Sequence, residues 1–269
     1  MIGKTRHTPG LELDCGVLKH AATPGTYRHH RYPPCEALSE WVRHFWVESW
    51  DVRHDVPQVR EVLPHPCVHL VLARGRSRVY GVQLKRMARE LKGHDCIVGV
   101  KFRPGAFYPF LQRPVLSLAN RAVPLRDLFR DADDAERALE RCSDEQGMVE
   151  VASRLLLNNL PPRDPLVNVA DAATEQIRVD RSITRVEHLV AKHDRSARTL
   201  QRLFCRYVGA NARWVIKRYR VFEALGRLAS GGAVEFAALA QDLGYYDQAH
   251  FINDFKRLVG RSPAAYFKA

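Results

Sequence analysis

The chain has 269 residues, of which 46% are hydrophobic and 27% charged, so it is long enough for two folded domains with separate cores. Its six cysteines are scattered without a Cys-x-x-Cys pair, no apolar run approaches the roughly 18 residues of a membrane span, and the N-terminus lacks an apolar signal segment. We therefore expect a cytoplasmic protein with reduced thiols, which sets aside membrane proteins and secreted disulfide scaffolds.

The N-terminal half is β-rich in character. Residues 1–35 show no clear periodicity and are expected to be irregular. Between residues 38 and 130, short apolar runs alternate with Gly and Pro turn signals. The predicted strands are 42–50, 59–63, 67–72, 77–82, 87–91 and 97–102. Many short strands at this spacing predict an antiparallel barrel or sandwich, an architecture that often holds a small ligand.

Residues 131–160 change to a helical pattern that ends at Pro161-Pro162, and residues 161–165 are typical of an interdomain linker. We expect an α+β protein in three parts. Residues 1–130 are a β-rich sensing or dimerisation domain, residues 131–165 are a helical segment and linker, and residues 166–269 are an all-α domain.

The segment from Ser196 to Tyr207 organises this last part. Ser196 is a strong N-cap residue, and Leu200, Phe204 and Tyr207 belong to the apolar face of an amphipathic helix. A helix from Ser182 to about residue 193 and a short turn precede it, which is the size of a helix-turn-helix unit.

The same pattern recurs 51 residues downstream. Ser196 corresponds to Asp247, and the matching pairs that follow are Leu200 and Phe251, Phe204 and Phe255, Val208 and Val259, and Gly209 and Gly260. A fixed offset of this kind indicates an internal duplication. We interpret it as two helix-turn-helix units in tandem, joined by a long helix over residues 212–229. The second unit combines helices at 236–243 and 247–258, and a short final helix reaches residue 267.

Positive charge is concentrated in the first of these units. The whole chain has a formal net charge of +12, and residues 181–220 alone hold 11 Lys or Arg against 2 Asp or Glu. Residues 221–269 hold 5 of each. A basic segment of this density favours a polyanion partner, because lysine and arginine neutralise phosphates and release counterions. The alternative is an ordinary solvated basic surface.

The second unit carries a motif that closely resembles the signature of AraC/XylS-type transcription regulators. The motif is Leu239-Ala240-x-x-Leu243-Gly244-Tyr245-Tyr246-Asp247-Gln248-Ala249-His250-Phe251, then Phe255-Lys256-Arg257-x-x-Gly260-x-Ser262-Pro263-x-x-Tyr266. Ser196-x-Arg198-x-Leu200-x-Arg202-x-Phe204 resembles the first half of the same domain, although Asn211-Ala212 stands where the family usually has Ser-Pro. The resemblance covers about residues 167–269. It implies that helices 196–206 and 247–258 enter successive major-groove segments of DNA.

Residues 38–130 also resemble the β-rich N-terminal region of a less characterised AraC-like subgroup. Leu63-Pro-His-Pro66 and Gly99-Val-Lys-Phe-Arg-Pro-Gly-Ala-Phe107 carry this likeness, which implies no known ligand.

The resemblance implies a set of DNA-contacting residues. The expected base contacts are Arg198, Gln201, Arg202, Gln248, Ala249, His250, Ile252 and Asn253. The expected phosphate contacts are Ser196, Thr199, Arg206, Lys217, Arg218, Lys256, Arg257 and Arg261. The charge distribution adds a hypothesis. The first unit should dominate the salt-dependent affinity, so neutralising Arg202 and Arg206 should reduce the salt dependence more than neutralising Lys256 and Arg257.

Three functional readings stay open. The favoured one is a sequence-specific transcription regulator, an activator for example, whose expected partner is double-stranded DNA. RNA polymerase, an unidentified small-molecule effector and a second copy of the chain are further candidates, and no membrane partner is expected. The second reading is an enzyme whose β-rich domain is catalytic and whose helical domain only locates it on DNA. Tight zinc at His65, Cys67 and His69, which alternate along a predicted strand, would favour it. The third is a non-specific architectural DNA binder. We expect no enzyme activity, catalytic residue, metal or cofactor.

Overall fold

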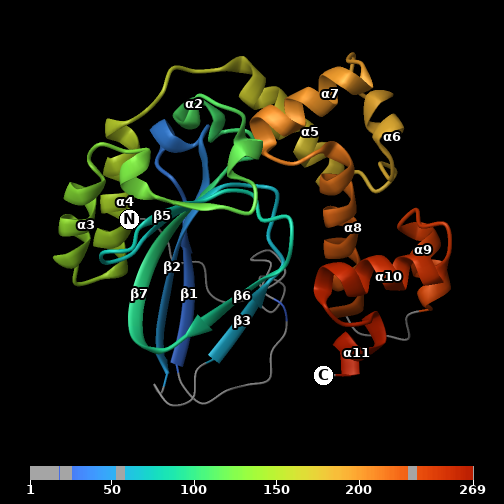
Figure 1. The fold of residues 1–269 in the computed structure, drawn as a ribbon, viewed down its shortest axis with the longest axis horizontal. Helices are drawn as coiled ribbons and strands as arrows, with labels where there is room; N and C mark the ends of the chain where they lie inside the picture. The colour runs from blue at the N-terminus through green and yellow to red at the C-terminus, as the bar shows by residue number, and fades with distance from the viewer. Residues whose placement is uncertain (1–17, 19–25, 53–57, 230–234, 269) are drawn as a thin grey trace.

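A six-stranded antiparallel sheet forms the centre of the N-terminal half (Figure 1). The computed structural model describes residue 18 and residues 26–52, 58–229 and 235–268. The strands are β1 (Thr26–Tyr32), β2 (Val42–Val52), β3 (Gln58–Val62), β4 (His69–Leu72), β5 (Arg78–Tyr80), β6 (Met87–Leu91), β7 (Gly93–Phe102) and β8 (Ala122–Pro124). Their order in the sheet is β1-β2-β7-β4-β5-β8, and β3 pairs with β6 as a separate two-stranded ribbon. The predicted α+β class is confirmed, but the sheet is open and does not close into a barrel.

Two strands lie outside the predicted set. β1 carries Tyr27, His29 and Arg31 on one side, so it has no apolar alternation for a sequence pattern to detect. It pairs with β2 from Thr26 opposite Asp51 to Tyr32 opposite Phe45. The expectation of irregular structure is therefore wrong for residues 26–32, while residues 1–17 and 19–25 lie outside the described residues. β8 is only three residues long and ends at Pro124.

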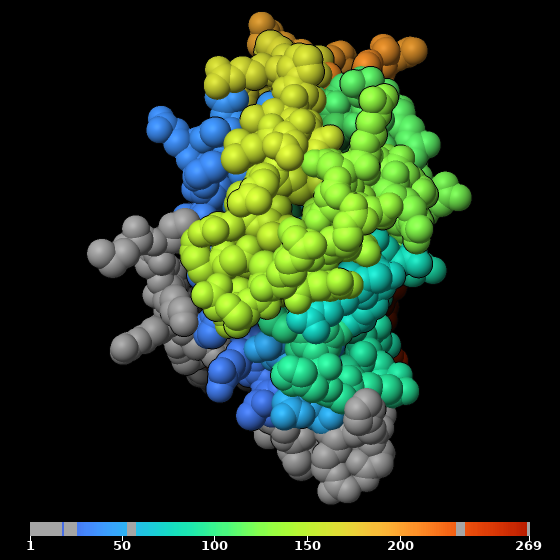
Figure 2. Space-filling model, turned by 90° about the vertical axis from the view of Figure 1, so that its left-hand side faces the viewer, coloured from blue at the N-terminus to red at the C-terminus, as the bar shows by residue number. Residues whose placement is uncertain are grey.

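The two faces of the sheet have different neighbours. Phe45 and Val47 of β2 belong to the main hydrophobic core on one face, where α3 (Ala132–Glu140) and α4 (Glu145–Asn158) pack. Figure 2 shows these two helices over that side of the molecule. The alternate residues Trp46 and Glu48 face the β3–β6 ribbon instead. β2 is therefore buried on both faces, but only one face packs against helices.

The helical segment predicted at residues 131–160 is two helices. Asp144 accepts a hydrogen bond from the backbone N–H of Gly147 at 2.8 Å and starts α4 as a new helix. The other short elements of this half are η1 (Glu36–Leu38), α2 (Tyr108–Leu111), η2 (Val115–Leu118) and η3 (Leu125–Asp127).

The C-terminal half is helical throughout the part that the structure describes. Its elements are α5 (Pro165–Val179), α6 (Val186–Val190), α7 (Ala197–Leu203), the π-helical turn η4 (Phe204–Val208), α8 (Ala212–Ala229), α9 (Phe236–Asp242), α10 (Gln248–Val259) and α11 (Pro263–Lys268). The predicted helix from Ser182 is wrong at its start. The Ser182 hydroxyl donates to Asp180 Oδ1 at 2.7 Å within a turn, and α6 begins four residues later. None of the described helices is long and apolar enough to cross a membrane.

The hydrophobic core does not divide where the sequence suggests a linker. One continuous cluster runs from the sheet through α4 and α5 into α7 and the start of α8, and it includes Leu200, Phe204 and Ile216. A second cluster holds Phe251 and Phe255 with the C-terminal part of α8. The first helix-turn-helix unit therefore shares the main core with the sheet, whereas the second unit packs around a separate cluster that also includes Leu18 and Leu63 of the N-terminal half.

Candidate nucleic-acid interface

α7 is positioned by its own cap and by the core beneath it. The Ser196 hydroxyl accepts from the backbone N–H of Thr199 at 3.2 Å, and Gly209 ends the segment with a φ of +88°. Leu200 and Phe204 are fully buried, so the opposite face of the helix must point outward. That face presents Arg198, Gln201 and Arg202, all exposed.

α10 repeats this geometry. The Asp247 carboxylate accepts from the backbone N–H of His250 at 2.7 Å, and Gly260 ends the helix with a φ of +89°. Phe251 and Phe255 are fully buried at the positions of Leu200 and Phe204. Matching caps, buried positions and terminal glycines support the duplication inferred from the 51-residue offset.

The outward face of α10 differs from that of α7 in chemistry. Gln248, Ala249 and Asn253 are exposed, whereas Ile252 is half-buried against the core of the second unit. His250 lies edge-on to the ring of Tyr245, with ring centroids 5.2 Å apart. The first unit thus exposes two arginines and one amide, and the second unit exposes two amides beside smaller or aromatic groups.

The residues expected at phosphates fall into two groups. Ser196, Thr199 and Lys256 are exposed, and Arg257 is exposed while pairing with Asp254 at 2.8 Å. Lys217 pairs with the same carboxylate at 2.7 Å and thereby joins α8 to α10.

The other three cations contact the N-terminal half. Arg206 Nε donates to the Tyr108 hydroxyl at 2.7 Å, and its guanidinium stacks on the same ring. Arg261 pairs with Glu61 of β3 at 3.4 Å. These contacts tie the end of each unit to the sheet domain.

Arg218 is fully buried, in contrast to the exposed position that a phosphate contact needs. Its Nη2 donates to the Leu84 carbonyl at 2.9 Å, and the guanidinium stacks on Trp214. Within the described residues, its Nε and Nη1 have no hydrogen-bond partner. Burial lowers the pKa of Arg218 to about 9. The Arg218 side chain therefore connects α8 to the segment between β5 and β6.

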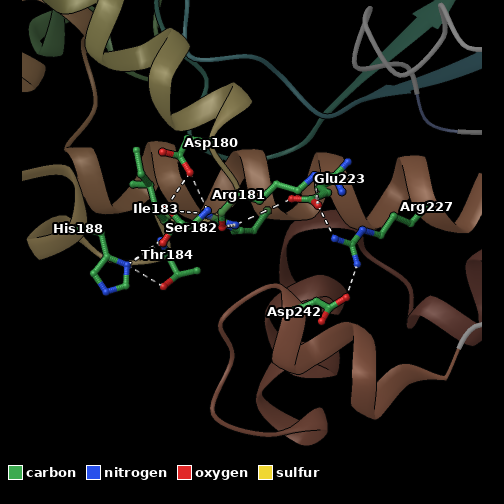
Figure 3. Close-up of polar contacts among 10 residues, drawn as sticks. Asp180, Arg181, Ser182, Ile183, Thr184, His188, Glu223, Arg227 and Asp242 are labelled. Carbon is green, nitrogen blue, oxygen red and sulfur yellow. Dashed lines mark hydrogen bonds and ion pairs between the residues drawn. The ribbon is translucent and has the colours of Figure 1, made fainter. Parts of the chain in front are cut away.

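A polar network connects the two units through α8 (Figure 3). Glu223 of α8 pairs with Arg181 at 3.0 Å and with Arg227 at 2.7 Å, and Arg227 continues to Asp242 of α9 at 2.7 Å. Arg220 donates to the backbone carbonyls of Arg181 and Ile183, in the loop between α5 and α6. The network runs from the loop before the first unit, across α8, to the first helix of the second unit.

A glycine allows the two units to touch. Gly244 lies in the turn between α9 and α10 with a φ of +73°, and a Cβ at this position would overlap the side chain of Thr184. The close approach of this turn to the α5–α6 loop supplements the connection through α8.

The three residues considered for zinc do not share a strand. β4 begins at His69, and the backbone N–H of Cys67 donates to the His65 carbonyl at 2.8 Å in a turn before it. His65 stacks on Phe222 of α8, with centroids 4.2 Å apart, whereas Cys67 Sγ lies 3.4 Å from His69 Nε2. Over the described part of the chain, no group of three or more His, Cys, Asp or Glu is arranged to hold a metal ion.

Two family models match the chain. Residues 30–124 match a domain of unknown function, DUF6597, and residues 189–269 match a helix-turn-helix domain. The C-terminal part of the chain is an AraC-type helix-turn-helix domain. The protein is therefore a DNA-binding transcription regulator.

Similar solved structures include crystal structures of ToxT from Vibrio cholerae. One, at 1.65 Å resolution, has a TM-score of 0.39 and 10% identity, over 91% of this chain and 98% of that chain. Another, of unsaturated fatty acid bound wild-type ToxT from strain SCE256, has a TM-score of 0.36 and 12% identity, over 93% and 97% of the two chains. Among curated proteins, the sequence comparison finds no match.

Two exposed residues of the AraC-type domain escaped the sequence analysis. Arg195 and Tyr246 each stand one residue before an N-cap, and Tyr246 is 92% exposed. They are related by the same 51-residue offset as the caps. Extending the internal alignment by one position would have found them.

Proposed function

We propose that the protein binds specific DNA sequences by placing α7 and α10 in successive major-groove segments on one face of the duplex. The observation that carries the proposal is the duplicated geometry, in which each helix has the same cap, the same buried positions and an exposed polar face. Arginine pairs bidentately with guanine, and glutamine or asparagine with adenine. Arg198, Gln201 and Arg202 are the proposed readers of the first segment, and Gln248, His250 and Asn253 those of the second. Ala249 and Ile252 would pack on thymine methyl groups.

The proposed backbone contacts lie at the start and end of these helices. Ser196, Thr199, Lys256 and Arg257 keep this role, and Arg195 and Tyr246 join them because both are exposed beside a recognition helix. The proposed phosphate contacts no longer include Arg206, Lys217 and Arg261. Their side chains bond instead to Tyr108, Asp254 and Glu61 within the protein. Arg218 is left out of the set because its side chain is buried.

The N-terminal half, residues 1–130, is proposed to sense a small ligand or to mediate dimerisation, and residues 166–269 to bind DNA. The N-terminal half shares a hydrophobic core with the first helix-turn-helix unit, and this shared core supports a mechanical link between ligand sensing and DNA binding.

Selection of bound sites from random double-stranded DNA tests the proposal, with the full chain at one fixed salt concentration. A reader with two recognition helices should enrich two short conserved segments about 10 base pairs apart, one helical turn. A single conserved segment would contradict the use of both helices. A specific-to-random affinity ratio near one would favour the non-specific architectural binder instead.

A further inference from the structure

A cavity of about 450 Å³ lies between the six-stranded sheet and the β3–β6 ribbon. Its floor consists of alternate residues of the sheet strands, those that point away from the main core. Residues of β3 and β6 cover it. The volume is within the range of pockets that hold small molecules, roughly 300–1,000 Å³.

The wall of the cavity is positively charged. Among the described residues it includes six basic side chains, Arg31, Arg60, Arg76, Arg78, Arg89 and Lys101, and one acidic side chain, Glu48. Glu48 is already paired with His29 at 3.3 Å and with Arg89 at 3.1 Å. Arg76 and Arg78 are exposed, and Arg76 pairs with Asp95, whereas Lys101 is buried. An anion that enters the cavity therefore meets an excess of positive charge, and electrostatic attraction is strongest at the buried Lys101.

Lys101 marks the positive end of the cavity. It is 8% exposed and lines both this cavity and a smaller recess of about 80 Å³ that reaches Arg178 of α5 and Tyr219 of α8. His44 and His69 lie nearby, and burial together with the charge of Lys101 lowers their pKa values to about 2 and about 3. Both histidines are neutral at pH 7, so the positive charge is carried by Lys101 and Arg31.

The floor beside this positive end is flat and aromatic. Trp46 lies against the backbone of β7 because residue 99 is glycine, and a Cβ there would overlap the indole ring. His29 stacks parallel to Trp46, with ring centroids 6.1 Å apart and an interplanar angle of 14°. A flat apolar group can lie along this surface, with an attached anion at Lys101.

We propose that this cavity binds a small organic anion with a flat apolar body. The charged group lies at Lys101 and Arg31, and the body lies between Trp46 and the β3–β6 ribbon. This binding site rests on the small-ligand sensing proposed above for the N-terminal half. Binding of the anion does not require that the protein binds DNA, and only the effect of the ligand on DNA binding depends on the proposed function.

The ribbon that covers the cavity also contacts the second helix-turn-helix unit. Glu61 of β3 pairs with Arg261, and the Arg86 guanidinium lies against Gly260 at the end of α10. Leu63, which follows β3, is fully buried in the core of the second unit together with Leu18. A ligand that shifts the ribbon therefore shifts α10, while α7 stays with the sheet through the shared core. Occupancy would change the spacing between the two recognition helices.

Two dyes of the same ring skeleton test the binding site on the full chain. 8-Anilinonaphthalene-1-sulfonate is an anion, and N-phenyl-1-naphthylamine lacks its sulfonate. We expect saturable fluorescence enhancement with the anion, weakened about tenfold by Lys101→Met, as for the loss of one charge-assisted hydrogen bond. The neutral dye should bind more weakly than the anion and be insensitive to Lys101→Met. Equal effects of Lys101→Met on both dyes, or none on the anion, would overturn the proposal.

A cavity-filling variant locates the dye. Val71 lines the cavity from β4, and Val71→Trp should abolish binding of the anion because the larger ring occupies the same space. Arg126→Gln, at an exposed position of the same half, is the matched control and should bind as the wild type does. Circular dichroism and thermal unfolding establish that each variant is folded, and Arg60→Gln replaces Lys101→Met if that variant is not. Wild-type binding by Val71→Trp would place the dye elsewhere and refute the site.

Hydrogen exchange with and without the anionic dye tests the coupling. Exchange should change in β3, in β6 and in α10 and α11, and stay constant in α7. Changes confined to the sheet and ribbon would refute the coupling while leaving the binding site. Dye binding is measured without DNA. The protein can therefore bind the dye even if it selects no DNA sites, and it can select DNA sites even if it does not bind the dye.

Discussion

Arg198, Gln201 and Arg202 lie on one exposed face of α7, and none of them has a hydrogen bond or ion pair to another described side chain. Binding to bases therefore breaks no side-chain hydrogen bond or ion pair of these three residues within the described part of the chain. Removal of a bidentate arginine–guanine pair is expected to cost about 1–3 kcal/mol at the preferred base.

Arg198→Ala should therefore weaken binding to the selected site by about ten- to a hundredfold, and relax the preference at one base pair of the first segment. Titration against a set of single-base variants of that site measures both effects. Arg126→Gln, which removes a charge from an exposed position of the N-terminal half, should leave binding nearly unchanged. A uniform loss on every sequence would instead assign Arg198 to a phosphate.

Arg218 shows how burial changes the role of a basic residue. Its one described hydrogen bond is to the Leu84 carbonyl, which also accepts from Trp214 Nε1 at 3.2 Å. A buried charge with few partners is costly, and an apolar residue of similar shape is often as good or better. Arg218→Met should leave the free energy of unfolding unchanged or raise it by about 1 kcal/mol.

The same variant separates structure from DNA contact. Urea unfolding measures its stability, and the salt dependence of DNA affinity should equal that of the wild type. A smaller salt dependence with unchanged stability would return Arg218 to the phosphate contacts, through an arrangement in which α8 has left the sheet domain.

At the scale of elements, the two helix-turn-helix units have the same caps, buried positions and terminal glycines, but they differ in net charge. Residues 181–220 hold most of the excess positive charge, and within the second unit Asp254 pairs with both Lys217 and Arg257. Arg206 contacts Tyr108, so Arg195 is a better choice than Arg206 for testing the charge of the first unit.

Arg195→Gln with Arg202→Gln should reduce the slope of log affinity against log salt by about 0.9 for the phosphate contact of Arg195, and by a further amount because Arg202 places a positive charge in the groove between the phosphates. Lys256→Gln with Arg257→Gln should reduce it by less, because Arg257 is already paired. DNA binding measured over a range of salt concentrations gives both slopes. Equal reductions would end the idea that the first unit supplies most of the electrostatic affinity.

At the scale of the whole molecule, the continuous core makes the sheet and the first unit one folded body. His44 and His69 of the sheet have lowered pKa values because burial and Lys101 disfavour their charged forms. Arg31 adds to this effect at His44, whereas Glu48 opposes it at His69. In the unfolded chain both histidines take up a proton near pH 6.5. Their contribution to stability is therefore fully present above that pH and is lost as the pH falls toward 3.

Between pH 6.5 and pH 5, the free energy of unfolding should fall by up to about 1.4 kcal/mol per pH unit for each histidine. His69→Gln should reduce this pH dependence, and His94→Gln, at an exposed position, should not. Urea unfolding at several pH values measures it. Hydrogen exchange should accelerate in β7 and α7 together, and acceleration in β7 alone would show that the shared core does not couple them.

The sequence predicted those elements whose patterns are local. Strands β2 to β7 have apolar residues between turn signals, and the caps Ser196 and Asp247 set the starts of α7 and α10. β1 escaped because its side chains toward the cavity are polar, and α6 starts late because Asp180 holds Ser182 in a turn. The missed strand β1 and the wrong start of α6 have the same cause. A polar group whose hydrogen-bond partner is distant in sequence, or lies in a turn, leaves no periodic signal in the sequence.

By itself the sequence determined the duplicated helices α7 and α10, their outward side chains and the excess of positive charge, because caps, helical spacing and composition are properties of short segments. Only the tertiary structure decided that Arg218 is buried, that Arg206 and Arg261 contact the sheet domain, and that the β3–β6 ribbon lies between a cavity and the second unit. These contacts depend on which segments, distant in the sequence, pack against one another in the folded chain. Glu61 and Arg261 are 200 residues apart in the chain, and no local pattern records that they pair.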